Sequence, residues 1–152
     1  MDVKYVNPFL SSFKNVMPQI GFEKVERGKV SIKEKDLITS GVLTIVGIVG
    51  DLKGNIIYSL DTNSAKQIVS KMMMGVEIDE FNEMAQSALS ELSNMLTANA
   101  SIEFSNMNIN MNISTPTLMY GENIRTAFNT SKVLCVEILV DNIPIEVIIS
   151  IN

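Results

Sequence analysis

Residues 132–140, K-V-L-C-V-E-I-L-V, and residues 144–151, P-I-E-V-I-I-S-I, are two strongly apolar runs that flank the pair Asp141-Asn142. Both runs are rich in Val and Ile, which favour strands because their branched side chains pack well on a pleated surface. Asp and Asn readily adopt the turn conformations that join neighbouring strands. This stretch therefore predicts an antiparallel hairpin, and Cys135, with apolar neighbours on both sides, is expected to be a buried core thiol.

Four further stretches predict strands of the same, largely antiparallel sheet. Alternation over residues 22–35 favours a half-exposed strand that bends at Gly28, whereas residues 41–49 are apolar on both faces and predict a central strand. The turn at residues 51–54 joins that central strand to N-I-I-Y-S-L as a hairpin. Residues 106–114 alternate Asn or Ser with Met or Ile, and this period of two predicts a strand with one exposed face.

Helical spacing of apolar residues predicts three helices that pack on this sheet. Their expected ranges are 7–18, 62–74 and 79–100, with Asn7, Asp61 and Asp79 as N-caps, Pro18 as the end of the first helix and Gly75 as the end of the second. Neither a linker nor an internal repeat divides the chain. We therefore expect one α+β domain over residues 1–152, with a long third helix.

The bulk composition excludes several classes of partner. The chain has 152 residues, of which 46% are hydrophobic and 19% charged, and this balance is typical of a globular domain. Its formal net charge of −5, with scattered Lys and Arg, argues against binding to nucleic acid or to an anionic membrane. The first residues do not resemble an export signal, and the longest apolar run, residues 41–50, covers about half of a membrane span. We expect a cytoplasmic protein without a membrane partner.

The sequence contains no histidine, and this excludes several mechanisms. Ser-His and Cys-His nucleophile pairs are impossible, and so are zinc sites with histidine ligands. C-x-x-C, Walker and G-x-G-x-x-G motifs are also missing from the sequence. We therefore expect this chain to bind no metal or cofactor of its own, and any chemistry must use carboxylates, amides and hydroxyls.

The third helix contains S-A-L-S-E-L-S-N-M-L-T-A-N at residues 87–99. Two stripes follow its length, and the second is displaced from the first by one residue, about 100° around the helix axis. The apolar stripe, which we expect to face the core, consists of Phe81, Ala85, Ala88, Leu92 and Met95. The polar stripe at its rim consists of Glu80, Glu83, Ser87, Glu91 and Asn94. Because Glu91 and Asn94 lie three residues apart, both can reach into one partner.

The spacing E-x-x-N is not informative by itself. The chain is rich in Asn, and the same spacing recurs at Glu103 and Asn106, near the expected end of the third helix, where side-chain directions no longer converge. On composition alone, a solvated helix face is a better explanation of Glu91 and Asn94 than a functional site is.

A longer pattern around these residues resembles the signature of the CheC/CheX/FliY family of chemotaxis phosphatases. In that signature, Asp or Ser, Glu and Asn are followed by a proline about twenty residues later. Ser87, Glu91 and Asn94 match it, and Pro116 follows Asn94 after 21 intervening positions. The chain is short and carries a single copy, so it is more similar to CheX than to CheC. It departs from the pattern at Thr97-Ala98, where relatives often have Ala-Gly, and this departure affects helix packing rather than the site.

The resemblance implies dephosphorylation of a phosphorylated CheY-type receiver. The receiver is expected to supply the aspartyl phosphate, its Mg²⁺ and a lysine, so that only a group that orients water is missing. Asn94 is expected to orient the attacking water with its amide, and Glu91 to pair with the receiver's lysine. Ser87 is expected to be a lesser partner contact, and Pro116 a structural part of the motif.

Two alternatives to catalysis remain open from the sequence. The first is a module that binds a receiver without catalysis, like related flagellar switch components. The second is a subunit whose purpose is assembly, because strands rich in Val and Ile form an aggregation-prone edge if they are left uncovered. We expect a homodimer through sheet edges, as in CheX relatives, and this state is compatible with phosphatase activity.

Overall fold

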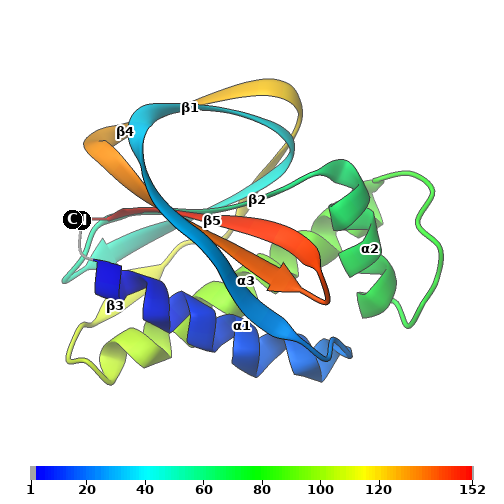
Figure 1. Cartoon of the computed structure of the whole chain (residues 1–152), viewed down its shortest axis with the longest axis horizontal. Helices are drawn as coiled ribbons and strands as arrows, with labels where there is room; N and C mark the ends of the chain where they lie inside the picture. The colour runs from blue at the N-terminus through cyan, green and yellow to red at the C-terminus, as the bar shows by residue number, and fades with distance from the viewer. Residues whose placement is uncertain (1–2, 152) are drawn as a thin grey trace.

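The computed structural model describes residues 3–151, apart from the side chain of Ser131, so residues 1, 2 and 152 of the predicted domain lie outside the described residues. It confirms the α+β class, with helices packed on a largely antiparallel sheet (Figure 1). The elements in chain order are the 3-10 helix η1 (Val3–Tyr5), α1 (Val6–Ile20), β1 (Val25–Gly50), β2 (Gly54–Leu60), α2 (Thr62–Met72), α3 (Glu83–Ser105), β3 (Met111–Ile113), β4 (Thr117–Val140) and β5 (Ile143–Ile151).

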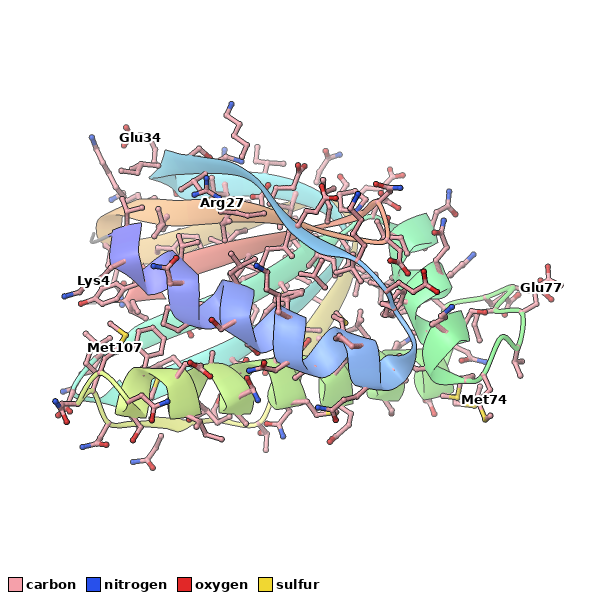
Figure 2. The ribbon with its side chains drawn as sticks, turned by 60° about the horizontal axis from the view of Figure 1, so that its bottom comes forward. Lys4, Arg27, Glu34, Met74, Glu77 and Met107 are labelled. Atoms are coloured by element: carbon pink, nitrogen blue, oxygen red, sulfur yellow. The ribbon has the colours of Figure 1, made fainter. Side chains whose placement is uncertain are left out.

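The principal core lies between the helices and one face of the sheet. Helices α1 and α3 run side by side (Figure 2), and the Ser12 hydroxyl of α1 donates a hydrogen bond to the carbonyl of Leu96 in α3. The ring of Phe9 meets the ring of Phe104 edge-on, with 5.8 Å between ring centroids. Both rings are fully buried. The burial of these apolar faces, rather than helix propensity, is the main stabilisation of α1 and α3.

The two predicted hairpins are confirmed. Strands β4 and β5 meet at Asp141 and Asn142, whose φ angles of 48° and 66° are those of a tight turn with left-handed residues. Strands β1 and β2 pair in antiparallel register from Ile48 opposite Gly54 to Val42 opposite Leu60. Helix α2 begins at the predicted cap, Asp61.

The strands predicted at residues 22–35 and 41–49 form one continuous strand, β1, and the division between them was wrong. The polar residues between them remain paired with β4, in a two-stranded region where the outer face meets solvent. The predicted bend at Gly28 is confirmed as a register shift between Arg27 and Val30. A further shift falls at Gly41, where φ is 111° and a Cβ atom would lie 2.4 Å from the Leu60 carbonyl oxygen, so that only glycine fits.

The sheet closes on itself through β1. Strand β1 pairs with β4 over residues 25–45 and with β2 over residues 42–48, so residues 42–45 have a partner on each side. Strand β2 in turn pairs with β5, and β5 with β4. Where they pair only with each other, β1 and β4 arch over the sheet face opposite the helices (Figure 1). We call residues 30–41 of β1 and 121–133 of β4 the β1–β4 arm. Its inner side covers a second small core, which confirms Cys135 as a buried thiol beside Phe128 and Ile148.

Several predicted helix boundaries need correction. Helix α1 starts one residue before the predicted cap Asn7 and passes Pro18, because Val16 and Met17 still bury its inner face. It ends at Gly21, whose φ of 117° allows its N–H to donate to the Pro18 carbonyl. Helix α3 is capped by Asn82, whose Oδ1 accepts a hydrogen bond of 3.0 Å from the Ala85 N–H, and not by Asp79.

The tract predicted as a strand over residues 106–114 is mostly a turn. Helix α3 extends to Ser105 rather than Ala100, and the chain then reverses through Asn108, whose φ is 61°. Only Met111–Ile113 forms a strand, β3, which pairs with the end of β1. The alternation of Asn with apolar residues was misleading because Asn tolerates left-handed turn conformations.

Candidate functional site

The rotation of α3 about its axis differs from the predicted one. The buried residues of the helix are Ala85, Leu89, Leu92, Ser93, Leu96, Thr97, Ala100 and Phe104, whereas Ala88 and Met95, which were predicted to face the core, are only half-buried. Two of the buried residues, Ser93 and Thr97, are polar, and an apolar pattern cannot reveal them. Their burial fixes which face of α3 remains outside.

Ser93 and Thr97 are held by hydrogen bonds to the sheet. The hydroxyl of Ser93 donates to the Leu89 carbonyl at 3.0 Å, which leaves Ser93 Oγ to accept from the hydroxyl of Thr44 in β1. Thr97 donates to the Ser93 carbonyl at 2.8 Å and lies 2.8 Å from the Tyr58 hydroxyl of β2. Burial raises the pKa of Tyr58, so the phenol stays protonated and donates to Thr97. The buried polar groups are thus satisfied and fix α3 on the sheet.

This anchoring directs Glu91 and Asn94 away from the core. With about 100° between successive helical residues, Asn94 lies about 100° and Glu91 about 160° from the buried Ser93. The structure accordingly leaves Glu91 exposed and Asn94 half-buried, on the same side of α3. Ser87, one turn before Glu91, is also exposed. The predicted polar stripe of α3 is therefore at the surface, as expected.

Pro116 lies across from these residues, in the link between β3 and β4. The link is fixed to β1 because the Gly47 N–H donates to Ser114 Oγ at 2.8 Å and the Ser114 N–H donates to the Gly47 carbonyl at 2.9 Å. Strand β4 then begins at Thr117, which pairs with Ile45. Proline at this point costs no ladder hydrogen bond, because regular pairing starts only after it.

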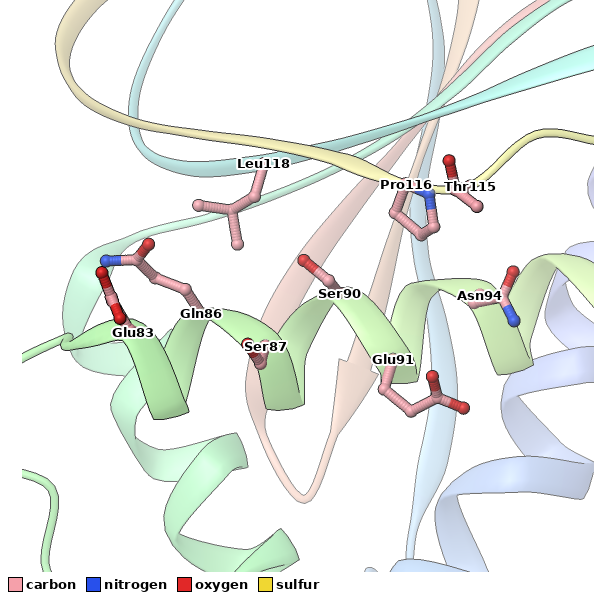
Figure 3. A pocket seen from close by; sticks show the side chains of 9 residues that line it. All are labelled: Glu83, Gln86, Ser87, Ser90, Glu91, Asn94, Thr115, Pro116 and Leu118. Atoms are coloured by element: carbon pink, nitrogen blue, oxygen red, sulfur yellow. The ribbon is translucent and has the colours of Figure 1, made fainter.

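An open groove with a volume of about 510 Å³ lies between α3 and this link. Figure 3 shows Glu91 and Asn94 on consecutive turns of α3, with Pro116 and Thr115 above the helix. The groove is lined by Glu83, Gln86, Ser87, Ser90, Glu91, Asn94, Thr115, Pro116 and Leu118. The structure thus brings all four predicted motif residues to one concave surface.

Sequence reasoning missed part of this lining. Gln86 and Ser90 lie on α3 between the predicted positions, and only the path of the link decides that they face the groove. Thr115 and Leu118 flank the predicted Pro116. Alternation along the start of β4 gives a signal for Leu118, because residues two apart on a strand face the same side.

The groove offers free hydrogen-bonding groups rather than a nucleophile. Within the described residues, the side chains of Glu91 and Asn94 form neither a hydrogen bond nor an ion pair. A carboxylate can accept from a cation, and a carboxamide can both donate and accept. The hydroxyls of Ser87 and Ser90 have no histidine to activate them, since the chain contains none. The arrangement suits the positioning of another molecule's reacting groups.

Other parts of the described chain offer no competing centre. Over residues 3–151, no three or more acidic or cysteine side chains gather as ligands for a metal ion. Burial raises the pKa of the Cys135 thiol to about 11, with further contribution from Glu146, so it is protonated near neutral pH. None of the described helices is both long and apolar enough to cross a membrane.

Comparison with known proteins identifies the family. Residues 42–139, which include the whole predicted motif, match the family described as chemotaxis phosphatase CheX. The CheY-P phosphatase CheX of Thermotoga maritima is 30% identical over 126 residues, which is 82% of this chain and 81% of that protein.

Solved structures agree over almost the whole chain. A CheC-like superfamily protein from Shewanella sp. PV-4 has a TM-score of 0.87 and 24% identity, and the match covers 100% of this chain and 99% of that one. In the CheX-CheY-BeF3-Mg²⁺ complex from Borrelia burgdorferi, the matching chain has a TM-score of 0.80, 28% identity and 99% coverage of both chains. Together with the motif and the fold, these matches show that the chain belongs to the CheX family of chemotaxis phosphatases.

Proposed function

We propose that this chain accelerates hydrolysis of the aspartyl phosphate on a CheY-type receiver domain in the cytoplasm. The Thermotoga relative is named a phosphatase of phosphorylated CheY, and the Borrelia relative was solved in complex with CheY, BeF3 and Mg²⁺. The observation that carries the proposal is the pair of unpartnered side chains, Glu91 and Asn94, on adjacent turns at one groove.

In this proposal the phosphorylated receiver supplies most of the reaction centre. An acyl phosphate is already activated, so its hydrolysis depends on an in-line water and on stabilised phosphoryl charge. The receiver's own Mg²⁺ stabilises that charge, and we propose that this chain holds no metal. The oxygen of water forms a bond to phosphorus, the bond from phosphorus to the aspartyl oxygen breaks, and the receiver regains a free carboxylate and releases phosphate.

Asn94 is proposed to orient the attacking water. Its carboxamide oxygen accepts a hydrogen bond from the water and its amide group donates one, which restricts the water to the in-line direction. Glu91 is proposed to accept a hydrogen bond from a lysine next to the phosphorylated aspartate and so to align α3 across the receiver's site. Ser87, one turn away, is proposed to contact the receiver, and Pro116 to keep the opposite wall of the groove in place.

The direct test is to mix the chain with a phosphorylated CheY-type receiver and Mg²⁺ and to follow loss of the phosphoryl group. We expect the chain to accelerate this loss in a catalytic manner, with one molecule discharging many receivers. Tight binding of the phosphorylated receiver without faster loss of its phosphoryl group would contradict the proposal and favour a non-catalytic receiver-binding or switch-like module.

We also propose that two copies associate through the β1–β4 arm. Within the described residues, the outer edges of this arm have no strand partner, so their backbone N–H and C=O groups are free to pair. Ile32 and Ile38 of the arm are 54% and 62% exposed, although both are strongly apolar. A two-fold axis that joins two such arms would cover both the edges and these side chains.

A further inference from the structure

A second groove continues the first along α3 toward its N-terminus. It has a volume of about 780 Å³ and shares Glu83 and Gln86 with the groove that holds Glu91 and Asn94. From Asn94 to Glu83 the helix rises roughly 16 Å, because each residue adds about 1.5 Å. The two grooves therefore form one continuous depression, and the proposed reaction site occupies only one end of it.

One wall of this depression is apolar. Pro116, at the end of the link, and Leu118 and Tyr120, in the start of β4, follow one another at every second residue, and each of them lines one of the two grooves. Tyr120 is 59% exposed as a residue, yet the orientation of its ring is restrained by an edge contact with Phe81, with 6.0 Å between ring centroids. We call Pro116, Leu118 and Tyr120 the apolar row.

The other wall is acidic. Asp79, Glu80, Glu83 and Glu91 line the two grooves, against a single lysine, Lys66. Within the described residues none of these four carboxylates forms an ion pair, and the Lys66 ammonium donates instead to the Asp79 carbonyl at 2.7 Å. We call Asp79, Glu80 and Glu83 the acidic rim.

We infer that the depression is an extended docking surface for the receiver, which selects receivers whose surface beside the phosphorylation site carries an apolar side chain next to a lysine or arginine. This inference rests on the proposed function, and the depression is continuous with the proposed reaction site. An apolar side chain from the receiver packs against the apolar row, and the cation pairs with the acidic rim. The exposed face of the Tyr120 ring can also hold the cation, because the ring quadrupole attracts positive charge.

From the positions of the two walls we expect them to affect binding of the receiver and not the chemical step. Asp79, Glu80 and Tyr120 line only the second groove, away from the groove that holds Asn94. Their contacts exist before and during the reaction alike, and such uniform binding lowers KM without raising kcat. The acidic rim should also attract basic receivers from a distance, an effect that salt screens.

The test uses the full chain, a CheY-type receiver with Mg²⁺, and two single substitutions. Tyr120→Thr removes the ring but keeps a good strand former, and Glu80→Lys reverses a charge in the link before α3 without altering a helix. Glu23→Lys, an exposed charge reversal that lines neither groove, is the control. Affinity is measured with the receiver activated by BeF3, which stands in for the phosphoryl group, and KM and kcat with the phosphorylated receiver.

We expect both test substitutions to raise Kd and KM about tenfold and to leave kcat unchanged. The control should match the parent. We also expect Glu80→Lys to flatten the salt dependence of binding. Parent-like Kd values for both Tyr120→Thr and Glu80→Lys would overturn the inference, and so would losses confined to kcat.

The two proposals fail in different ways. If the parent binds the BeF3-activated receiver but does not accelerate hydrolysis, the proposed catalysis is wrong, while the Kd values still decide the docking surface. If the parent discharges the receiver but the test variants bind normally, the docking surface is wrong and catalysis stands. If the parent does not bind the activated receiver, both are overturned.

Discussion

Glu91 and Asn94 have different functional groups, so their loss should have different consequences. Truncating Glu91→Ala removes the only charge of the pair. Because Glu91 is proposed to face a receiver lysine, the truncation leaves that lysine unpaired at the interface, which typically costs about 2 kcal/mol or more. Affinity for the BeF3-activated receiver should therefore fall at least about thirtyfold. Titration of the receiver with each variant measures this.

The chain provides its own control for this substitution. Glu103 and Asn106 repeat the E-x-x-N spacing, but Glu103 lies in the last turn of α3 and Asn106 is its C-cap residue. Glu103→Ala should therefore bind the activated receiver like the parent. Equal losses for Glu91→Ala and Glu103→Ala would show that the effect is on helix stability or overall charge and not on a receiver contact.

At the scale of single residues, the motif positions could be predicted from the sequence. Ser87, Glu91, Asn94 and Pro116 are recognisable by type and spacing, and the structure gathers them at one groove. Gln86, Ser90 and Thr115 were not identified, because their part in the lining depends on how the link before β4 passes over α3. No spacing rule within one helix contains that information.

At the scale of elements, the contact between α3 and β2 depends on the buried Tyr58–Thr97 hydrogen bond. Tyr58→Phe should lower the free energy of unfolding by about 1 kcal/mol at neutral pH, because Thr97 loses its partner while the packing of the ring is kept. Urea denaturation of parent and variant measures this difference. An unchanged free energy of unfolding would contradict the assigned role of this bond.

The same substitution predicts a change in the pH dependence of stability. Burial raises the pKa of Tyr58 above its ordinary value of 10.0, so the folded chain retains a proton that the unfolded chain releases. The contribution of the protonated phenol to the free energy of unfolding is fully present below pH 10.0 and is lost as the pH rises above it. The parent should therefore lose more stability than Tyr58→Phe between about pH 9 and 11, as measured by urea denaturation at both values. Parallel losses would contradict a buried, protonated phenol.

The predictions of elements failed where polar residues are buried or where polar strands are exposed. Ser93 and Thr97 face the core, so the apolar pattern of α3 placed the buried stripe on Ala88 and Met95 instead. The polar residues between 35 and 41 interrupted the strand pattern of β1, although backbone pairing with β4 continues through them. In both cases hydrogen bonds to distant segments decide the outcome, and local sequence does not report them.

At the scale of the whole molecule, closure of the sheet through β1 could not be predicted. Both hairpins follow from local apolar runs and turn residues, but the pairing of one long strand, β1, with both β4 and β2 is a property of the complete fold. The closure nevertheless has a consequence for assembly, because it confines unpaired backbone edges mainly to the β1–β4 arm and the short β3.

The proposed self-association through the arm predicts a concentration-dependent dimer. In sedimentation equilibrium at micromolar concentration, the parent should have twice the mass of the 16.8 kDa chain. Ile38→Lys should shift the equilibrium toward the monomer, because it places a charge among the exposed apolar side chains that the second copy would cover. Circular dichroism checks that the variant is folded. A monomeric parent would refute this part of the account.

The central claim is that Asn94 orients the water that attacks the receiver's aspartyl phosphate, and the most direct measurement is the rate of phosphoryl loss catalysed by Asn94→Ala at saturating receiver. Removing one oriented catalytic group should reduce kcat roughly a hundredfold, while the variant still binds the BeF3-activated receiver and Asn106→Ala matches the parent. If Asn94→Ala discharges the phosphorylated receiver as fast as the parent, the claim is wrong.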